Sequence, residues 1–253
     1  MNIRTITCSD PREDTSIEEL LDFMNKNPMV EIAVQATPSK ITVGTARSKW
    51  FERLLRGVRN NPRPLNLAMH VNQEYCDYMC RGLIPDDLLS WFFTSCPNGK
   101  PVIKRWQLNF SGSKTETIDY AELARLIKDM GDREFIMQHD GSQSSGLHLL
   151  RLRACMTEPT YSVLYDKSSG NGVSPERWNR PYPGVYTGYA GGLRPENVSA
   201  ELDRISTVAG RDKTVWVDAE GGLKVPGTKT FSVDRAQVYV NAVMQWQRKN
   251  LAR

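Results

Sequence analysis

The chain has 253 residues, of which 40% are hydrophobic and 25% charged, and its formal net charge is +4. These values are typical of a soluble globular protein. No apolar run approaches the roughly 18 residues that a membrane-spanning helix needs, so no membrane partner is expected. The small positive charge does not single out nucleic acid as a partner, whereas it would suit an anionic small molecule.

The N-terminus lacks the long apolar stretch of a signal peptide, which favours a cytoplasmic protein. Five cysteines are scattered along the chain and do not resemble a disulfide framework. Cys76 and Cys80 stand four residues apart on a predicted helix and share one face, but no partner lies at zinc-finger spacing. We therefore expect free thiols.

Strand-like and helical runs alternate along almost the whole chain. Strands are predicted at residues 3–8, 30–35, 65–70, within 102–110, and at 134–138, 161–165, 185–189 and 214–217. Helices are predicted to open at Ser16, to include residues 50–55, and to cover 73–81, 85–92, 118–130, 198–208 and 233–249. Glu19 follows Ser16 at capping-box spacing. The run 146–151 fits a helix or a strand.

Eight strands separated by helices imply parallel pairing with right-handed crossovers. About 250 residues is also the usual size of a (β/α)8 barrel. The predicted fold class is therefore α/β, a single closed TIM barrel, rather than an open doubly wound sheet. Because no Gly/Ser-rich linker divides the chain, we expect residues 1–253 to form one domain.

Polar residues are frequent at the carboxyl ends of the predicted strands, where barrel enzymes carry their functional groups. These positions hold Cys8, Ser9, Asp10, Gln35, His70, Gln107, Asn109, Gln138, His139, Asp140, Asp166, Asp218 and Glu220. The set indicates a working pocket, although the polar start of each loop explains part of it.

Paired glycines follow the last two strands, Gly191-Gly192 after the seventh and Gly221-Gly222 after the eighth. Glycine lets the backbone approach a ligand closely, and backbone N–H groups hold phosphate well. The loops after strands seven and eight are a frequent phosphate site in barrels. After the sixth strand, Asp166 enters a turn with Gly170 and Gly172, which would wrap an anion or simply reverse the chain.

These motifs resemble the phosphoribosylanthranilate isomerase family. Ala190-Gly-Gly-Leu-Arg-Pro-Glu-Asn-Val198 is similar to that family's Ser-Gly-Gly-Leu-x-Pro-Glu-Asn-Val. Val217-Asp-Ala-Glu-Gly-Gly-Leu-Lys224 and Pro226-Gly-Thr-Lys229 resemble its strand-eight motif, and Leu164-Tyr-Asp166 resembles its strand-six motif. The resemblance covers roughly the last 95 residues. Before them only short pieces match, around Cys8 and at Gln107-Leu-Asn109.

The resemblance implies an aldose–ketose isomerase that acts on a phosphorylated sugar derivative by an Amadori rearrangement, without metal or organic cofactor. It makes Cys8 the general base and Asp166 the general acid, with Gly191, Gly192, Gly221 and Gly222 holding the phosphate. Those roles would require a raised pKa for Asp166 and a lowered one for Cys8. An ordinary strand-end thiol remains an equal alternative for Cys8.

The chain departs from the family at several positions. Ala190 replaces a serine, and Glu220 stands where the family has a small residue, so that its carboxylate would repel a phosphate. The chain also carries extra residues near 82–101 and 141–159. Two further functions therefore stay open.

The first alternative is an aldolase or lyase that uses His70, His139, Asp140 or Glu220. The second is a barrel that binds a phosphorylated ligand without converting it. The histidine spacing matches no metal motif, so no metal is predicted, and hydrogen-bonded pocket histidines are the simpler interpretation. The sequence does not indicate an oligomeric state.

Overall fold

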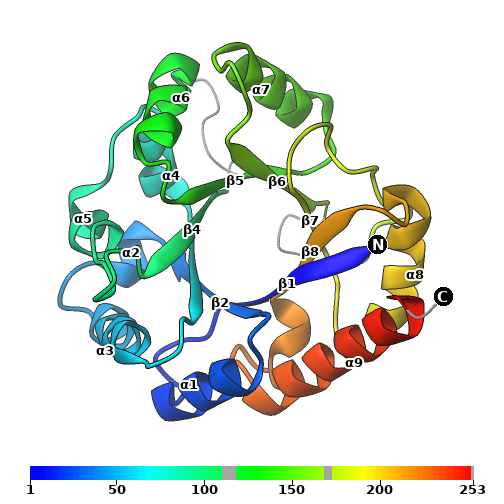
Figure 1. Ribbon diagram of the computed structural model, residues 1–253. Coiled ribbons are helices and arrows are strands. Elements are labelled where there is room, and N and C mark those ends of the chain that lie inside the picture. The colour runs from blue at the N-terminus through cyan, green and yellow to red at the C-terminus, as the bar shows by residue number, and fades with distance from the viewer. Residues whose placement is uncertain (110–117, 168–172, 252–253) are drawn as a thin grey trace.

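The computed structural model describes residues 1–109, 118–167 and 173–251, and its eight strands form one closed parallel barrel (Figure 1). The strands are β1 (Asn2–Ser9), β2 (Val30–Ala36), β3 (Asn66–Val71), β4 (Ile103–Leu108), β5 (Glu134–His139), β6 (Tyr161–Asp166), β7 (Thr187–Ala190) and β8 (Thr214–Ala219). Each strand pairs with its neighbours in chain order, and β8 closes the barrel on β1. The predicted α/β fold class is confirmed.

Helices surround the strands (Figure 1). They are α1 (Ile17–Lys26), α2 (Pro38–Ile41), α3 (Ala46–Asn60), α4 (Gln73–Met79), α5 (Asp86–Phe92), α6 (Tyr120–Asp129), α7 (Gln143–Ala154), α8 (Val198–Ala209), the 3-10 turn η2 (Gly221–Leu223) and α9 (Val233–Leu251). The predicted N-cap is present, because the Ser16 hydroxyl accepts a hydrogen bond from the Glu19 backbone N–H.

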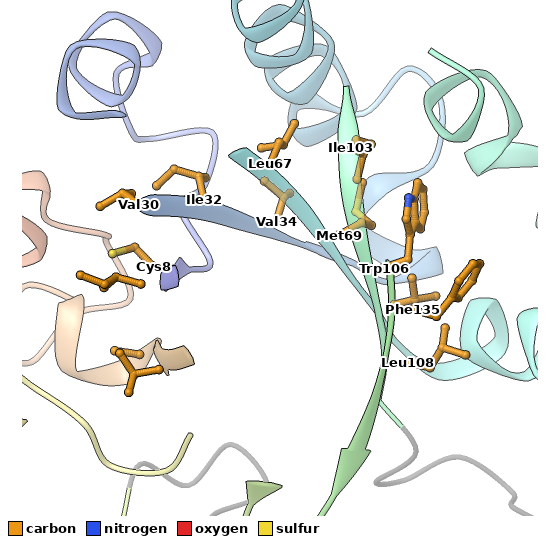
Figure 2. Packing of buried hydrophobic residues seen from close by; sticks show 14 of the residues in the cluster. Cys8, Val30, Ile32, Val34, Leu67, Met69, Ile103, Trp106, Leu108 and Phe135 are labelled. Carbon is orange, nitrogen blue, oxygen red and sulfur yellow. The ribbon is translucent and has the colours of Figure 1, made fainter. Parts of the chain in front are cut away.

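The main hydrophobic core lies between the strands and the helices. Figure 2 shows part of this layer, in which Val34, Trp106 and Phe135 of different strands pack with other buried side chains. The helices contribute their apolar sides, as α1 does with Leu20 and Phe23. Burial of this layer stabilises the closed barrel.

The inside of the barrel is stacked in layers, because alternate residues of each strand point inward. At the amino ends of the strands, Arg105 bridges Glu31 and Glu134. Above them, Ile136, Leu164, Ala190 and Trp216 form a separate apolar cluster. Polar residues occupy the carboxyl ends. On the side of β5 to β8, this apolar cluster lies between the ionic layer and the candidate site.

The structure settles two points that the sequence left open and changes the start of one strand. The ambiguous run 146–151 lies inside α7, so most of segment 141–159 is the helix that connects β5 to β6. Segment 82–101 contains α5 and a short antiparallel bridge between Ser95 and Pro101. β7 starts at Thr187, two residues after the predicted start.

Cys76 and Cys80 are free, buried thiols whose sulfur atoms lie 3.9 Å apart. Within the described ranges, no helix is both long enough and apolar enough to cross a membrane.

Candidate functional site

A cavity of about 420 Å³ opens at the carboxyl ends of the strands. It brings together most of the predicted site residues: His70, Gln107, Asn109, Gln138, Asp166, Gly191, Gly192, Asp218, Glu220, Gly221 and Gly222. Gly170 and Gly172 lie outside the described residues. The cavity sits where barrels of this type hold their ligands, and its wall is mainly polar.

Cys8 does not line the cavity. On β1 the side chains of Thr7 and Ser9 point into the barrel, where they contact Glu31 and Asp218. Cys8, between them, points outward into the core (Figure 2), is 0% exposed, and has its thiol pKa raised by burial. A buried thiol with a raised pKa on the far side of the strand is not placed to act as the general base.

Asp218, at the end of β8, is a buried acid of the cavity. Its Oδ1 accepts a 2.6 Å hydrogen bond from the Ser9 hydroxyl. Burial, aided by the charges of Glu220, Asp166 and Glu31, raises the pKa of Asp218 to about 8, although the hydrogen bond from Ser9 opposes the shift. A carboxyl group in this state is protonated near neutral pH and is able to donate a proton.

His70, at the end of β3, is the closest basic side chain to Asp218. Its Nε2 lies 3.7 Å from Asp218 Oδ2, which is too long for a good hydrogen bond. Burial, aided by the charge of Arg105, lowers the pKa of His70 to about 3. Since burial favours the neutral form of both groups, His70 and Asp218 form a neutral pair rather than an ion pair.

Asp166, at the end of β6, shares the cavity with Asp218. Its Oδ2 accepts a 3.1 Å hydrogen bond from the amide of Gln138 on β5. Both residues line the same cavity, and the charge of Asp166 contributes to the raised pKa of Asp218. The site therefore offers a paired arrangement of acidic groups, one of them held protonated, as acid–base catalysis requires.

The two glycine pairs form one edge of the cavity, which we call the glycine rim (Gly191, Gly192, Gly221 and Gly222). Gly191 and Gly192 have φ of +116° and +65°, which disfavour other residues. A side chain at Gly222 would lie 2.4 Å from the Leu193 carbonyl oxygen. None of the four N–H groups donates to another described residue. Such a rim is able to bind an anion.

Glu220 lies beside the glycine rim, but its charge is compensated. The Lys224 ammonium lies 3.0 Å from Glu220 Oε1 and 3.0 Å from Asp10 Oδ2. Arg12 donates to the same Asp10 oxygen at 2.6 Å. The expected repulsion of a phosphate by Glu220 is therefore reduced by two cations at the same edge.

His139 and Asp140 do not line the cavity. The Nδ1 atom of His139 lies 2.7 Å from the Ser145 hydroxyl and accepts from the Gly141 backbone N–H. Asp140 accepts from Ser142 N–H and from the Ser145 hydroxyl. Both residues thus stabilise the start of α7. Of the residues proposed for an aldolase or lyase, only His70 and Glu220 reach the cavity.

Five polar lining residues were not expected from the sequence: Arg12, Thr37, Lys40, Asn72 and Gln73. Ser9, Asp10 and Gln35, which the sequence places at strand ends, line the cavity as well. Asn72 could have been predicted, because it stands two residues after His70 and alternate residues of a strand point to the same side. Asp10 and Gln73 have positive φ, of 65° and 53°, which is uncommon outside glycine and marks local strain at the cavity.

Comparison of the sequence with protein-family models and with curated proteins found no match. Within residues 1–109, 118–167 and 173–251, no group of three or more His, Cys, Asp or Glu side chains is arranged to hold a metal ion. The site must therefore be interpreted from its own geometry.

Proposed function

We propose that the protein is an isomerase that interconverts the aldose and ketose forms of a phosphorylated sugar derivative. The observation that carries this proposal is that Asp166 and the buried Asp218 line one cavity edged by the glycine rim, and burial raises the pKa of Asp218 to about 8. Proton donor, proton acceptor and anion-binding backbone are the three components that such a reaction needs. The motif resemblance of β7 and β8 to phosphoribosylanthranilate isomerase supports the same class.

In this proposal Asp218 is the general acid and Asp166 the general base. Asp166 takes the proton from C2 while Asp218 gives its proton to the C1 carbonyl oxygen, which forms an enediol. Asp166 then returns a proton to C1, and the O2 proton passes to Asp218, which completes the ketose. This assignment moves the acid from Asp166 to Asp218, because burial holds the proton on Asp218.

Ser9 and Gln138 position the two acids. The Ser9 hydroxyl donates to Asp218 Oδ1 at 2.6 Å, which leaves Asp218 Oδ2 for the substrate. Gln138 donates to Asp166 at 3.1 Å. The glycine rim would bind the phosphate at the edge of the cavity and direct the sugar carbons toward the two carboxyl groups.

The test is turnover of aldose phosphates, followed by the C2 proton signal in ¹H NMR. Asp218→Asn and Asp166→Asn should each lower the rate at least about 100-fold, because each removes one proton-transfer group. Cys8→Ala is the matched control and should keep the wild-type rate. Loss of turnover in the Cys8 variant with normal turnover in Asp218→Asn would contradict the proposal.

The same measurement separates the binding-only alternative. A protein that is thermally stabilised by an aldose phosphate and converts none of the phosphates tried would be a binding protein. Stabilisation accompanied by turnover supports the isomerase.

A further inference from the structure

A chain of hydrogen-bonded side-chain amides runs along one wall of the cavity. Its members lie on or directly after β2, β3 and β4, across the barrel from β6 and β7. Gln35 Nε2 donates to Glu220 Oε2 at 3.1 Å, and Asn72 Nδ2 donates to Gln35 Oε1 at 2.7 Å. Asn109 Nδ2 donates to Asn72 Oδ1 at 2.8 Å. Gln107 Nε2 donates to Asn109 Oδ1, also at 2.8 Å. The chain thus connects β8 to β4 through β2 and β3.

Two anchors give this chain its direction. An ionised carboxylate only accepts hydrogen bonds, so Glu220 requires Gln35 to present its NH₂ group. Independently, Asn72 Nδ2 lies 3.0 Å from the His70 carbonyl oxygen, which also only accepts. Each amide must therefore donate toward Glu220 and accept from the next one.

The chain ends at Gln107, whose Oε1 is buried and has no hydrogen-bond partner in the described part of the protein. Gln107 is 3% exposed and lines the cavity. A buried acceptor without a donor is costly, and most native proteins satisfy such atoms. Because the direction of the chain prevents Gln107 from turning its amide, the missing donor has to come from a molecule in the cavity.

The rest of the lining indicates the class of that donor. Among the described lining residues the only ring is the imidazole of His70, so an aryl group would find no aromatic surface. Gln35, Asn72 and Gln107 instead present amides along this wall. Amide-rich walls suit hydroxyl groups, which both donate and accept.

We propose that Gln107 determines the specificity of the cavity by accepting a hydrogen bond from a sugar hydroxyl. The amide chain from Glu220 positions its oxygen. The inference rests on the proposed function in taking the ligand to be a sugar phosphate. It goes further by selecting a polyhydroxylated sugar over an aryl-substituted one, and by assigning Glu220 a place in the amide chain rather than contact with the phosphate.

The test measures dissociation constants by calorimetry for ribose 5-phosphate and for its 2-deoxy-2-fluoro and 3-deoxy-3-fluoro analogues. Fluorine keeps the size of a hydroxyl but cannot donate. The wild-type protein should bind at least one fluoro analogue about tenfold or more weakly than ribose 5-phosphate, since the buried acceptor is left without a donor. Gln107→Met, which keeps the side-chain length without the acceptor, should abolish that difference.

Gln107→Glu keeps an acceptor but cannot donate to Asn109 Oδ1, so it should retain the preference for the hydroxyl while binding all three ligands more weakly. Equal binding of all three ligands by the wild-type protein would overturn the inference, as would an undiminished preference in Gln107→Met, or absence of ribose 5-phosphate binding. Turnover of ribose 5-phosphate is measured separately. If the expected binding preference is present but no ribose 5-phosphate is converted, the isomerase proposal alone is contradicted. If ribose 5-phosphate is converted but the preference is missing, the role of Gln107 alone is contradicted.

Discussion

Asp218 is the residue on which the proposed chemistry depends. Its raised pKa, about 8, means that the acid form is present at neutral pH and is lost as the pH rises through about 8. Turnover limited by this proton donor should therefore fall above pH 8, by about tenfold per pH unit. A pH–rate profile of the wild-type protein measures this, and a rate that rises steadily to pH 10 would contradict it.

The same group predicts a pH-dependent stability. The carboxyl pKa is raised from 3.8 in the unfolded chain to about 8 in the fold, so the folded state loses stability as the pH rises between these values. Asp218→Asn removes the penalty. It should stabilise the protein at pH 8.5 by on the order of a few kcal/mol and change little at pH 4. Urea unfolding at both pH values checks this, and equal effects at both would refute it.

Cys8 should behave as a core thiol. Because it is fully buried and its pKa is raised by burial, it should not react with a thiol reagent in the native protein and should react on unfolding. Cys155, which is exposed, serves as the internal reference that reacts at once. Mass spectrometry of labelled peptides distinguishes the two, and labelling of Cys8 in the native protein would contradict its place in the core.

The contrast between Cys8 and Ser9 also shows where sequence reasoning loses precision at this scale. Adjacent strand residues point to opposite faces, so an error of one position in assigning the inward-facing residue exchanges a residue of the site, such as Ser9, for a residue of the core, such as Cys8. The family motif matches Cys8 because both have a cysteine at the end of the first strand. Nothing in the sequence of β1 indicates which of its residues point into the barrel. The contacts of Thr7 and Ser9 with Glu31 and Asp218 reveal it.

Among the elements, the loops after β7 and β8 carry the proposed phosphate site, and two neighbouring glycines in them offer a matched test. A side chain at Gly222 would lie 2.4 Å from the Leu193 carbonyl, whereas one at Gly221 meets nothing within 4 Å. Gly222→Ala should push the two loops apart, weaken inorganic phosphate binding at least about tenfold and destabilise the fold by about 1–3 kcal/mol. Gly221→Ala should leave stability unchanged within about 0.5 kcal/mol. Calorimetry and thermal melts compare the variants, and equal effects would contradict this geometry.

Most strands and helices were predictable because their apolar residues repeat with the period of one structure. α7 was not predictable in this way, because it carries leucines on its buried side and on its exposed side. Leu149 and Leu152 are buried, while Leu147 and Leu150 are exposed. A helix with apolar residues all around lacks the clear periodicity on which such predictions depend.

At the scale of the whole molecule, the barrel closes around a buried ionic layer. Arg105 lies 2.9 Å from Glu31 and 3.2 Å from Glu134, and its guanidinium stacks 4.3 Å from the Trp216 ring. Arg105→Met leaves Glu31 buried without its cation and should destabilise the barrel by about 3–5 kcal/mol. The double variant with Glu31→Gln should recover part of this loss. Urea unfolding measures both, and a neutral single variant would contradict the role of Arg105.

The eight-strand count made the fold predictable, and the strand-end rule located most of the cavity. The ionic layer and the amide chain were not predictable, because their members come from strands far apart in the sequence. Glu31 and Arg105 are 74 positions apart, and nothing local to either one indicates the other. Glu220 shows the same limit, because its place in the sequence predicts repulsion of a phosphate, whereas its contacts with Lys224 and Gln35 come from the fold.

The most direct test of the central claim is a crystal structure with ribose 5-phosphate bound. The proposed function predicts the phosphate within hydrogen-bond distance of N–H groups of the glycine rim, and the sugar carbons C1 and C2 between Asp166 and Asp218. A phosphate held elsewhere, or a sugar directed away from both carboxyl groups with Cys8 at the reacting carbon, would contradict it.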